Sequence, residues 1–408
     1  MCLLFAVLLG LLAHAWGQGG TSTIRGEVTD PQGAVIAGAT VTITNLATSA
    51  TRSMVSGTTG RFSFELIPPG EYKVETEAQG FKKQTISPVR ALINTPTDLN
   101  VKMEIGSVAE VVQVEAAAGT VAVNTQDATL GNNFVSQQIT QLPLEARNVT
   151  ALLTLQPGVN KDGYVAGARS DQSNVTLDGV DINDAQTNSI DSTVLRLNAE
   201  AIEEFRVTTT NANANQGRSS AAQVNLLTKG GTNAFHGSAF EFWRHESMTA
   251  NDFFANRLGR DAKGNELVPR KKLRRHTYGG TIGGPIVKDK AFFFYSYEGR
   301  TDHSEGSRVN VVPLPILGQG SMRYTATDGK DYVLTQAQLN QAFPVVSLNP
   351  TAISALAAAA QKYPANDYTV GDSQGASRLL NTAGFRFNAA TPVKLNSNVA
   401  KVDFNINN

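Results

Sequence analysis

Alternating apolar and polar residues dominate the first hundred positions of the chain and predict short β-strands. Over Thr23–Thr29, apolar or small side chains alternate with polar ones, the period-two pattern of a half-buried strand. Turn residues such as Pro68-Pro69-Gly70 separate segments of this kind. Short strands punctuated by turns indicate a β-sandwich. The segments that share the alternation are Thr23–Thr29, Thr40–Thr44, Arg61–Leu66, Glu71–Thr76 and Leu99–Met103.

The same region carries a set of short motifs around its turns. Gly26-x-Val28-x-Asp30, Gly60-x-Phe62 and Pro69-Gly70-x-Tyr72 together resemble the carboxypeptidase regulatory-like domain. This resemblance implies a transthyretin-like β-sandwich over residues 18–105 that acts as a spacer or binding accessory. It implies no peptidase activity.

Residues 106–235 change to a mixture of short helical and strand patterns, which predicts an α/β domain. Helices are expected at Ser136–Leu142 and Val149–Leu155, the second ended by Pro157-Gly158. One acidic cluster has the residue types of a calcium-binding loop, but its spacing does not fit such a loop, so we expect a solvated turn. Its residues are Asp178, Asp181, Asn183 and Asp184. Strands of four to seven residues are expected at Asn174–Leu177, Glu203–Thr209 and Gln223–Thr228.

Residues 236–408 contain longer amphipathic strands with very unequal connections. Val402 and Phe404 alternate with polar residues near the end of the chain, so that one face of the strand is apolar and the other is polar, as in a transmembrane β-barrel. A tight turn at Lys288–Lys290 and outside loops at 245–275 and 300–394 are expected, the latter with a helix at Thr351–Lys362. The other expected strands are Ser238–Arg244, Tyr278–Val287 and the aromatic-rich Ala291–Arg300.

The order of these regions, with their motifs, is similar to the Oar-like TonB-dependent outer-membrane receptors. The resemblance implies a plug domain over residues 106–235, with Asp178 and Gly179 in a plug motif, and the start of a β-barrel at 236. It further implies energised uptake of an unidentified substrate, an oligosaccharide or a peptide, across the outer membrane, with the N-terminal domain in the periplasm. The supporting motifs are Leu177-Asp178-Gly179-Val180, Glu203-Glu204-Phe205-Arg206-Val207, Gly279-Gly280-x-x-Gly283-Gly284-Pro285 and Val402-Asp403-Phe404-Asn405.

A β-branched stretch between the first two domains has a mechanical interpretation. An extended segment of this kind adds to a partner sheet through backbone hydrogen bonds. In the resembled family, the energy-coupling protein TonB engages a segment before the plug in this manner. The alternative is that the stretch is the last strand of the sandwich or an inert linker. Its residues are Glu110, Val111, Val112, Gln113 and Val114.

Composition excludes several classes of protein. Lys and Arg number 35 and so do Asp and Glu, which argues against a nucleic-acid partner. The ten-residue apolar run Leu3–Leu12 is too short to span a bilayer and, with the small residues that follow it, predicts a signal peptide at 1–17. That segment contains Cys2, the chain's one cysteine, so no thiolate metal site or cysteine nucleophile is expected. No His-Glu-x-x-His or Walker motif occurs; no enzyme and no cofactor is expected.

A transporter barrel of this type needs about 22 strands, and residues 236–408 supply only a few, so the barrel is expected to be truncated and the chain to be an N-terminal fragment. A basic run just before one strand is a candidate for lipid-phosphate contacts in the outer membrane, the alternative being a solvated loop. Its residues are Arg270, Lys271, Lys272, Arg274 and Arg275.

Aromatic residues leave two further alternatives open. An aromatic cluster on one strand favours a girdle at the membrane interface over a platform for a ligand. Its residues are Phe292–Phe294, Tyr295 and Tyr297. The alternative function is a surface carbohydrate-binding or adhesion protein without transport activity. It requires a flat, exposed aromatic platform on the sandwich, for which Phe62, Phe64 and Tyr72 are the candidates, although each also fits a core position.

Overall fold

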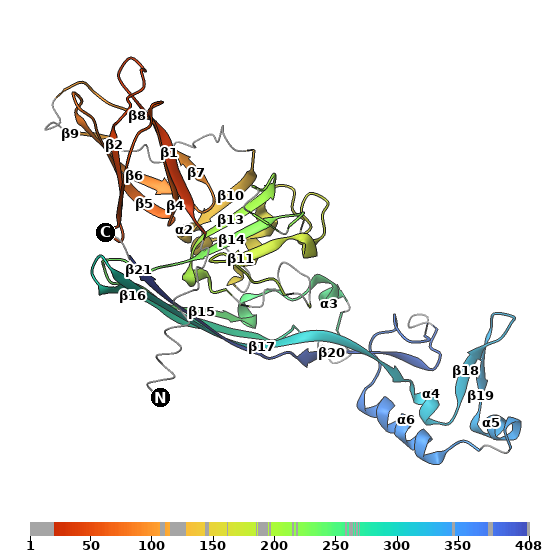
Figure 1. Cartoon of the computed structure of the whole chain (residues 1–408). Coiled ribbons are helices and arrows are strands. Elements are labelled where there is room, and N and C mark those ends of the chain that lie inside the picture. Colours follow the sequence, from red (N-terminus) through yellow and green to blue (C-terminus); the bar gives the residue numbers. More distant parts are fainter. Residues whose placement is uncertain are drawn as a thin grey trace, which may run out of the picture. The chain divides into compact units, whose positions relative to one another are not determined.

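The computed structural model divides the chain into two compact units, 1–240 with 279–298 and 396–408, and 241–278 with 299–395. Strands dominate both units (Figure 1). Within the described part of the chain, no helix is long and apolar enough to cross a membrane. The described residues are 20–106, 111–114, 128–142, 147–160, 162–184, 186, 195, 197–213, 216–217, 219–257, 259–260, 264, 266, 268, 270–344, 347–373 and 378–405, so the expected signal peptide lies outside them.

The N-terminal sandwich consists of two sheets that enclose one apolar core. One sheet has the order β4-β1-β7, with β8 also on β1, and the other has the order β3-β2-β5-β6-β9. Inward-facing Ile24, Val41 and Val74 are at most 1% exposed, which confirms the alternation on which the strand predictions rest. The strands are β1 Ser22–Thr29, β2 Thr40–Asn45, β3 Thr51–Val55, β4 Arg61–Ile67, β5 Gly70–Glu77, β6 Lys83–Ala91, β7 Pro96–Asp98, β8 Val101–Lys102 and β9 Val111–Val114.

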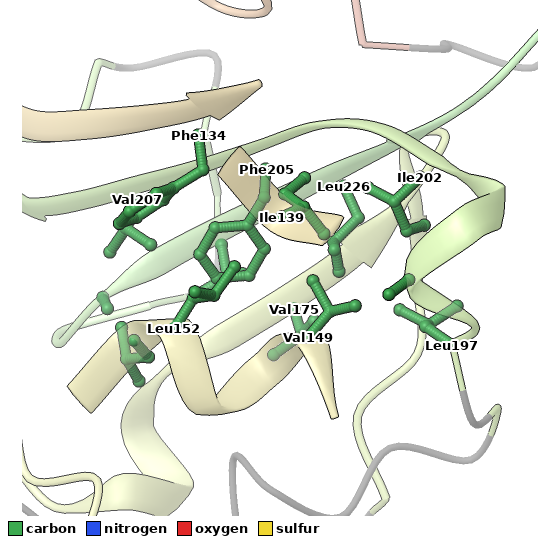
Figure 2. Close-up of a cluster of buried hydrophobic side chains, with 14 of the residues drawn as sticks. Phe134, Ile139, Val149, Leu152, Val175, Leu197, Ile202, Phe205, Val207 and Leu226 are labelled. Atoms are coloured by element: carbon green, nitrogen blue, oxygen red, sulfur yellow. The ribbon is translucent and has the colours of Figure 1, made fainter. Parts of the chain in front are cut away.

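Residues 128–228 form a second domain, called here the central domain, around a sheet with the order β10-β13-β14-β11-β12. Figure 2 shows the Phe205 ring between this sheet and η2, which carries Val149 and Leu152. The helix predicted at 136–142 is confirmed, whereas that at 149–155 is a 3-10 helix, begun by the Asn148 side chain. The elements are β10 Leu130–Val135, α2 Ser136–Gln141, η2 Val149–Leu155, η3 Ser170–Gln172, β11 Asn174–Leu177, β12 Val180–Asp181, η4 Ala199–Ala201, β13 Ile202–Thr210 and β14 Gln223–Thr228.

The third sheet has the order β15-β16-β17-β20, with β21 also on β17. Four of its five strands have ten residues or more, and β17 has 23, whereas no strand of the other sheets exceeds nine. The expected loop over 300–394 is therefore wrong at both ends, because Glu305–Pro313 pair in antiparallel register with Thr382–Ala390. The strands are β15 His236–His245, β16 Leu273–Val287, β17 Ala291–Pro313, β20 Thr382–Ala390 and β21 Val393–Phe404.

The side chains of this third sheet separate into two environments. Val402 and Phe404 are 53% and 67% exposed, as predicted for an apolar outer face. In β17, Tyr295 is exposed, but Phe292 and Phe294 are at most 1% exposed. These two phenylalanines therefore cannot belong to an interfacial girdle, because alternation places them on the face opposite Tyr295.

Beyond the end of β17, short elements form a small module at residues 314–381 (Figure 1). The predicted helix is confirmed as α6 Pro350–Lys362, capped by Asn349. A hydrogen-bonded ion pair with Arg378 lowers the pKa of Asp331 to about 2 and ties the hairpin of β18 and β19 to the segment before β20. The remaining elements of the compact unit at 241–278 and 299–395 are η5 Glu246–Met248, α3 Phe253–Arg257, α4 Pro315–Gly318, β18 Met322–Thr325, β19 Asp331–Leu334 and α5 Gln336–Ala342.

Candidate functional site

A buried carboxylate on β13 joins the central domain to the sandwich. Glu204 is 4% exposed, and its Oε2 atom accepts a hydrogen bond of 2.9 Å from the backbone N–H of Ile93, which follows β6. Its other oxygen accepts a hydrogen bond from the Asn133 amide on β10. Burial raises the pKa of the Glu204 carboxyl above its usual value, although the hydrogen bonds from Ile93 and Asn133 oppose the rise.

A guanidinium two residues further along β13 extends this contact. Arg206 donates to the Thr95 hydroxyl of the sandwich and, over 2.9 Å, to the Asn133 side-chain oxygen. Arg206 is 5% exposed, so its charge is compensated inside the protein rather than by water. We call the set Ile93, Thr95, Asn133, Glu204 and Arg206 the β13 clasp.

A second polar cluster joins the central domain to the inward face of β17. Arg147 pairs with Glu200 at 2.9 Å and lies 3.8 Å from a carboxylate oxygen of Glu298. Its guanidinium also lies 5.3 Å from the centre of the Phe240 ring, within the range of a cation–π contact. These contacts place one central-domain cation between two carboxylates and one aromatic ring.

A direct amide–hydroxyl hydrogen bond lies beside this cluster. The Asn198 amide donates to the Ser296 hydroxyl over 2.9 Å, and both residues are 1% exposed. Ser296 and Glu298 alternate with the outward Tyr295 and Tyr297 along β17. The inward face of this strand is therefore polar where the central domain meets it.

Asp178 and Gly179 form the turn between β11 and β12. Both have positive φ, 48° and 85°, which Asp tolerates and Gly adopts freely. The Asp178 carboxylate accepts from the Thr228 backbone N–H at 2.9 Å and from its hydroxyl at 2.6 Å. The motif residues therefore fix the turn and fasten it to the end of β14, which is a structural contact.

The expected coupling segment is an edge strand of the sandwich. Val111–Val114 form β9 and pair in parallel with Lys83–Ile86 of β6, whereas Glu110 lies outside the described residues. The structure thus agrees with the alternative that this segment is the last strand of the sandwich. Strand addition by a partner remains a prediction.

The basic run before β16 makes contacts with acidic and backbone groups. Arg275 forms a 2.7 Å ion pair with the buried Asp302. The other members are more exposed, since Lys271 and Lys272 lie on the surface. The remaining contacts are Lys272 with Glu305 at 3.6 Å, Arg274 with Glu246 at 3.6 Å and Arg270 with the Thr249 carbonyl at 3.1 Å.

The surface of the sandwich does not present the aromatic platform considered for glycan binding. Phe62, Phe64 and Tyr72 are 2–3% exposed and belong to the sandwich core. In the part of the chain that the structure describes, no group of three His, Cys, Asp or Glu side chains is placed to hold a metal ion.

Comparison with known families and proteins gives these features a context. The profile of the carboxypeptidase regulatory-like domain matches residues 23–104, and that of an outer membrane beta barrel domain matches residues 227–408. The chain therefore contains an N-terminal carboxypeptidase regulatory-like domain and a C-terminal region that matches an outer membrane beta barrel domain.

A curated relative narrows this class. The chain is a homologue of the TonB-dependent transporter Oar of Myxococcus xanthus, with 27% identity over 344 residues. The match covers 81% of this chain and 31% of the length of the relative.

Solved structures resemble parts of the chain. The siderophore receptor PirA from Acinetobacter baumannii overlaps 44% of this chain and 28% of its own, with 20% identity and a TM-score of 0.30. Hydroxyquinol 1,2-dioxygenase from Pseudomonas putida overlaps 22% of this chain and 57% of its own, with 11% identity and a TM-score of 0.18. TM-scores this low describe partial overlaps.

Sequence reasoning missed the β13 clasp and the Arg147 cluster. Glu204 and Arg206 stand in a motif that the resemblance singled out, yet their partners are 71 to 111 positions away in sequence. The available signal is that Glu204 and Arg206 lie beside the apolar Phe205 and Val207 in one strand, since buried charges require partners.

Proposed function

We propose that this chain belongs to a TonB-dependent outer-membrane receptor that takes up an unidentified substrate through a plugged β-barrel. The central domain acts as the plug, the third sheet contributes barrel strands, and the sandwich is a periplasmic accessory domain. Energy comes from the TonB complex, which engages residues 110–114. Transport rather than catalysis is the activity we assign.

The observation that carries the proposal is the polar contact between the central domain and β17. Arg147 lies beside the Glu298 carboxylate, and Asn198 donates a hydrogen bond to Ser296. Phe404 on β21, by contrast, lies exposed on an apolar face. A strand with a polar inner and an apolar outer face suits a barrel wall in lipid. Hydrogen bonds and ion pairs of this kind hold a plug in place while remaining exchangeable for water.

Lipid contact by the basic run is a further part of the proposal. Arg270, Lys271, Lys272 and Arg274 are exposed and precede or begin β16, where cations meet lipid phosphates. Asp302 holds Arg275, so we assign lipid contact to the other four residues.

The test is fractionation of the gene product followed by growth on candidate oligosaccharides and peptides, with TonB present or absent. We expect the protein in the outer-membrane fraction and at least one substrate whose use requires both this protein and TonB. Recovery in the soluble periplasmic fraction would overturn the proposal. A glycan array with residues 18–105 tests the carbohydrate-binding alternative, for which the buried Phe62, Phe64 and Tyr72 predict no binding.

A further inference from the structure

Three aromatic rings form a continuous row where β20 meets the end of α6. The ring centroids of Phe385 and Phe387 lie 5.4 Å apart and the ring planes 18° from parallel, so the two rings stack along β20. The Tyr363 ring continues the row, with its centroid 5.7 Å from that of Phe385. Tyr363 is 41% exposed and both phenylalanines are half-buried, so the row is open to solvent. We call Tyr363, Phe385 and Phe387 the aromatic row.

The face of the sheet that carries the aromatic row also carries polar side chains of β17. β20 lies alongside β17 in Figure 1, with Phe387 opposite Arg308 and Phe385 opposite Asn310. Residues directly opposite each other in an antiparallel pair share one face of the sheet. Arg308 and Asn310 are both exposed. Hydrogen-bond donors therefore stand beside the rings.

Two cations beside the aromatic row lack a carboxylate partner. The Lys362 ammonium lies 5.3 Å from the centre of the Tyr363 ring, at one end of the row. Within the part of the chain that the structure describes, neither Lys362 nor Arg308 forms an ion pair. The two nearest carboxylates before Arg308 on β17 are already paired, Asp302 with Arg275 and Glu305 with Lys272. The row is therefore bordered by positive charge that the protein does not compensate.

The edge of β20 beside the aromatic row is closed to an added peptide strand. The Asn366 side chain accepts a hydrogen bond from the Arg386 N–H at 2.7 Å and donates one to the Arg386 carbonyl at 3.0 Å. The backbone of Asp367 bonds the N–H and the carbonyl of Gly384 in the same way. These are the groups through which another strand would pair. A ligand of the row must therefore be held by ring faces and side chains.

We propose that the aromatic row and its two cations bind an acidic oligosaccharide, a linear sugar chain that carries carboxylates on its rings. The inference rests on the proposed uptake function and names the class of its substrate. The apolar C–H face of a pyranose stacks on an aromatic ring, and successive sugars of a chain cover successive rings of the row. Arg308 and Lys362 pair with the carboxylates, and the Asn310 amide bonds a hydroxyl.

Charge and shape together favour this ligand over two others. A neutral oligosaccharide would stack on the same rings but would leave both cations without a partner. An acidic peptide would match the charge, but it offers no flat apolar face at each unit and finds no open backbone edge on β20. A guanidinium binds a carboxylate through two parallel hydrogen bonds, so Arg308 should add selectivity as well as affinity.

The test measures binding of defined acidic sugars to the full chain purified in detergent. The probes are the tetramers of galacturonic, mannuronic and glucuronic acid, and isothermal titration calorimetry gives each Kd. The methyl ester of each tetramer is the matched control, because esterification removes the charge and keeps the sugar rings. We expect at least one acid tetramer to bind more than about tenfold tighter than its ester. Equal binding of acid and ester, or no binding of any acid tetramer, would overturn the inference.

Two substitutions test the rings and the charge separately. Phe387→Leu removes one ring and keeps an apolar side chain, whereas Arg308→Gln removes the charge of an exposed residue. We expect each to weaken binding of the acid tetramer more than about tenfold. Tyr324→Leu and Lys330→Gln, in the hairpin of β18 and β19, are the matched controls and should change the Kd by less than about threefold.

Two outcomes of the variant series count against the inference. Unchanged binding in both Phe387→Leu and Arg308→Gln, with thermal unfolding as in the unsubstituted chain, would place the sugar elsewhere. Hexaglutamate that binds through Phe387, when no acid tetramer binds, would show that the ligand is an acidic peptide. If Phe387→Leu does not fold, the exposed Arg308→Gln decides between these results.

The proposed uptake function fails or stands by a different measurement. Growth that requires this protein and TonB, on a neutral sugar or a peptide, with no binding of any acid tetramer, would contradict this inference and leave the uptake function intact. Binding of an acid tetramer through Arg308 and Phe387, with no growth that depends on TonB, would contradict the uptake function and leave the binding site intact.

Discussion

At the scale of single residues, the central domain compensates its buried charges with specific partners. Glu204 and Arg206 are both about 5% exposed, and each has hydrogen-bond partners from the sandwich and from β10. Removing one member leaves the others buried without a partner, which costs more than the net value of the bond. The clasp is therefore sensitive to single substitutions and to protonation.

The clasp should respond to pH through Glu204. Burial raises its folded-state pKa above the unfolded value of about 4.3, so the stability it contributes is fully present below about pH 4.3 and is lost as pH rises through the folded pKa. Hydrogen exchange of the Ile93 amide, corrected for its intrinsic rate, measures this loss. Glu204→Gln should flatten the profile, and the Val28 amide, bonded to the Gly60 carbonyl, is the reference. A wild-type Ile93 profile parallel to that of Val28 would contradict the prediction.

The Asp178 turn gives a second residue-scale prediction. Asp178→Ala removes both acceptors of Thr228 and places Ala at a positive φ, so we expect a loss of about 1–3 kcal/mol. Asp178→Asn keeps one side-chain acceptor and tolerates this φ, so its loss should be smaller. Exchange protection of the Thr228 amide measures both. An equal effect of the two variants would show that the carboxylate contacts do not matter.

At the scale of elements, a clear periodicity made several strands predictable. Strands with one buried face, such as β1, β2 and β5, follow a clear period of two and were predicted within a few residues. β3 and β10 were missed because their residues are mostly exposed and show no such alternation. The end of β17 was missed because pairing with β20, rather than local pattern, extends it.

Close backbone approach in the central sheet predicts the effect of one glycine substitution. A Cβ atom at Gly131 would lie 2.2 Å from the Val207 carbonyl oxygen, so Gly131→Ala must displace β10 from β13. We expect a cost of about 1–3 kcal/mol and faster hydrogen exchange in both strands. At Gly217 a Cβ would meet nothing within 4 Å, so Gly217→Ala is the control. Equal exchange in the two variants would refute the close approach.

At the scale of the whole molecule, the first and last family regions were predictable from sequence and long-range contacts were not. Each domain has its own local patterns, and the sandwich and the barrel domain match family profiles at 23–104 and 227–408. The clasp and the Arg147 cluster depend on residues from different domains, whose meeting no local pattern reveals. Sequence reasoning therefore predicted the extended stretch that forms the strand at 111–114 but not the polar contacts around the central domain.

The separate core of the sandwich predicts that residues 18–105 fold alone. Its buried residues, including Ile43 at 1% exposure, all come from this region. We expect cooperative urea unfolding with a free energy of about 4–10 kcal/mol, reduced by about 2–5 kcal/mol in Ile43→Ala. Leu46→Ala, at a position that is 48% exposed, should change it by less than about 0.5 kcal/mol. A gradual, non-cooperative transition would show that the sandwich needs the central domain.

The length of β17 has a consequence for what meets the cell from outside. About 9–11 residues of a tilted strand cross the hydrocarbon layer, whereas β17 has 23, so roughly a dozen remain beyond it. If this part of β17 lies on the outer side of the membrane, as expected for the region 300–394, the module at 314–381 that follows it belongs to the outer side as well. The hairpin of Tyr324 and Tyr332 would then be open to antibodies added to intact cells.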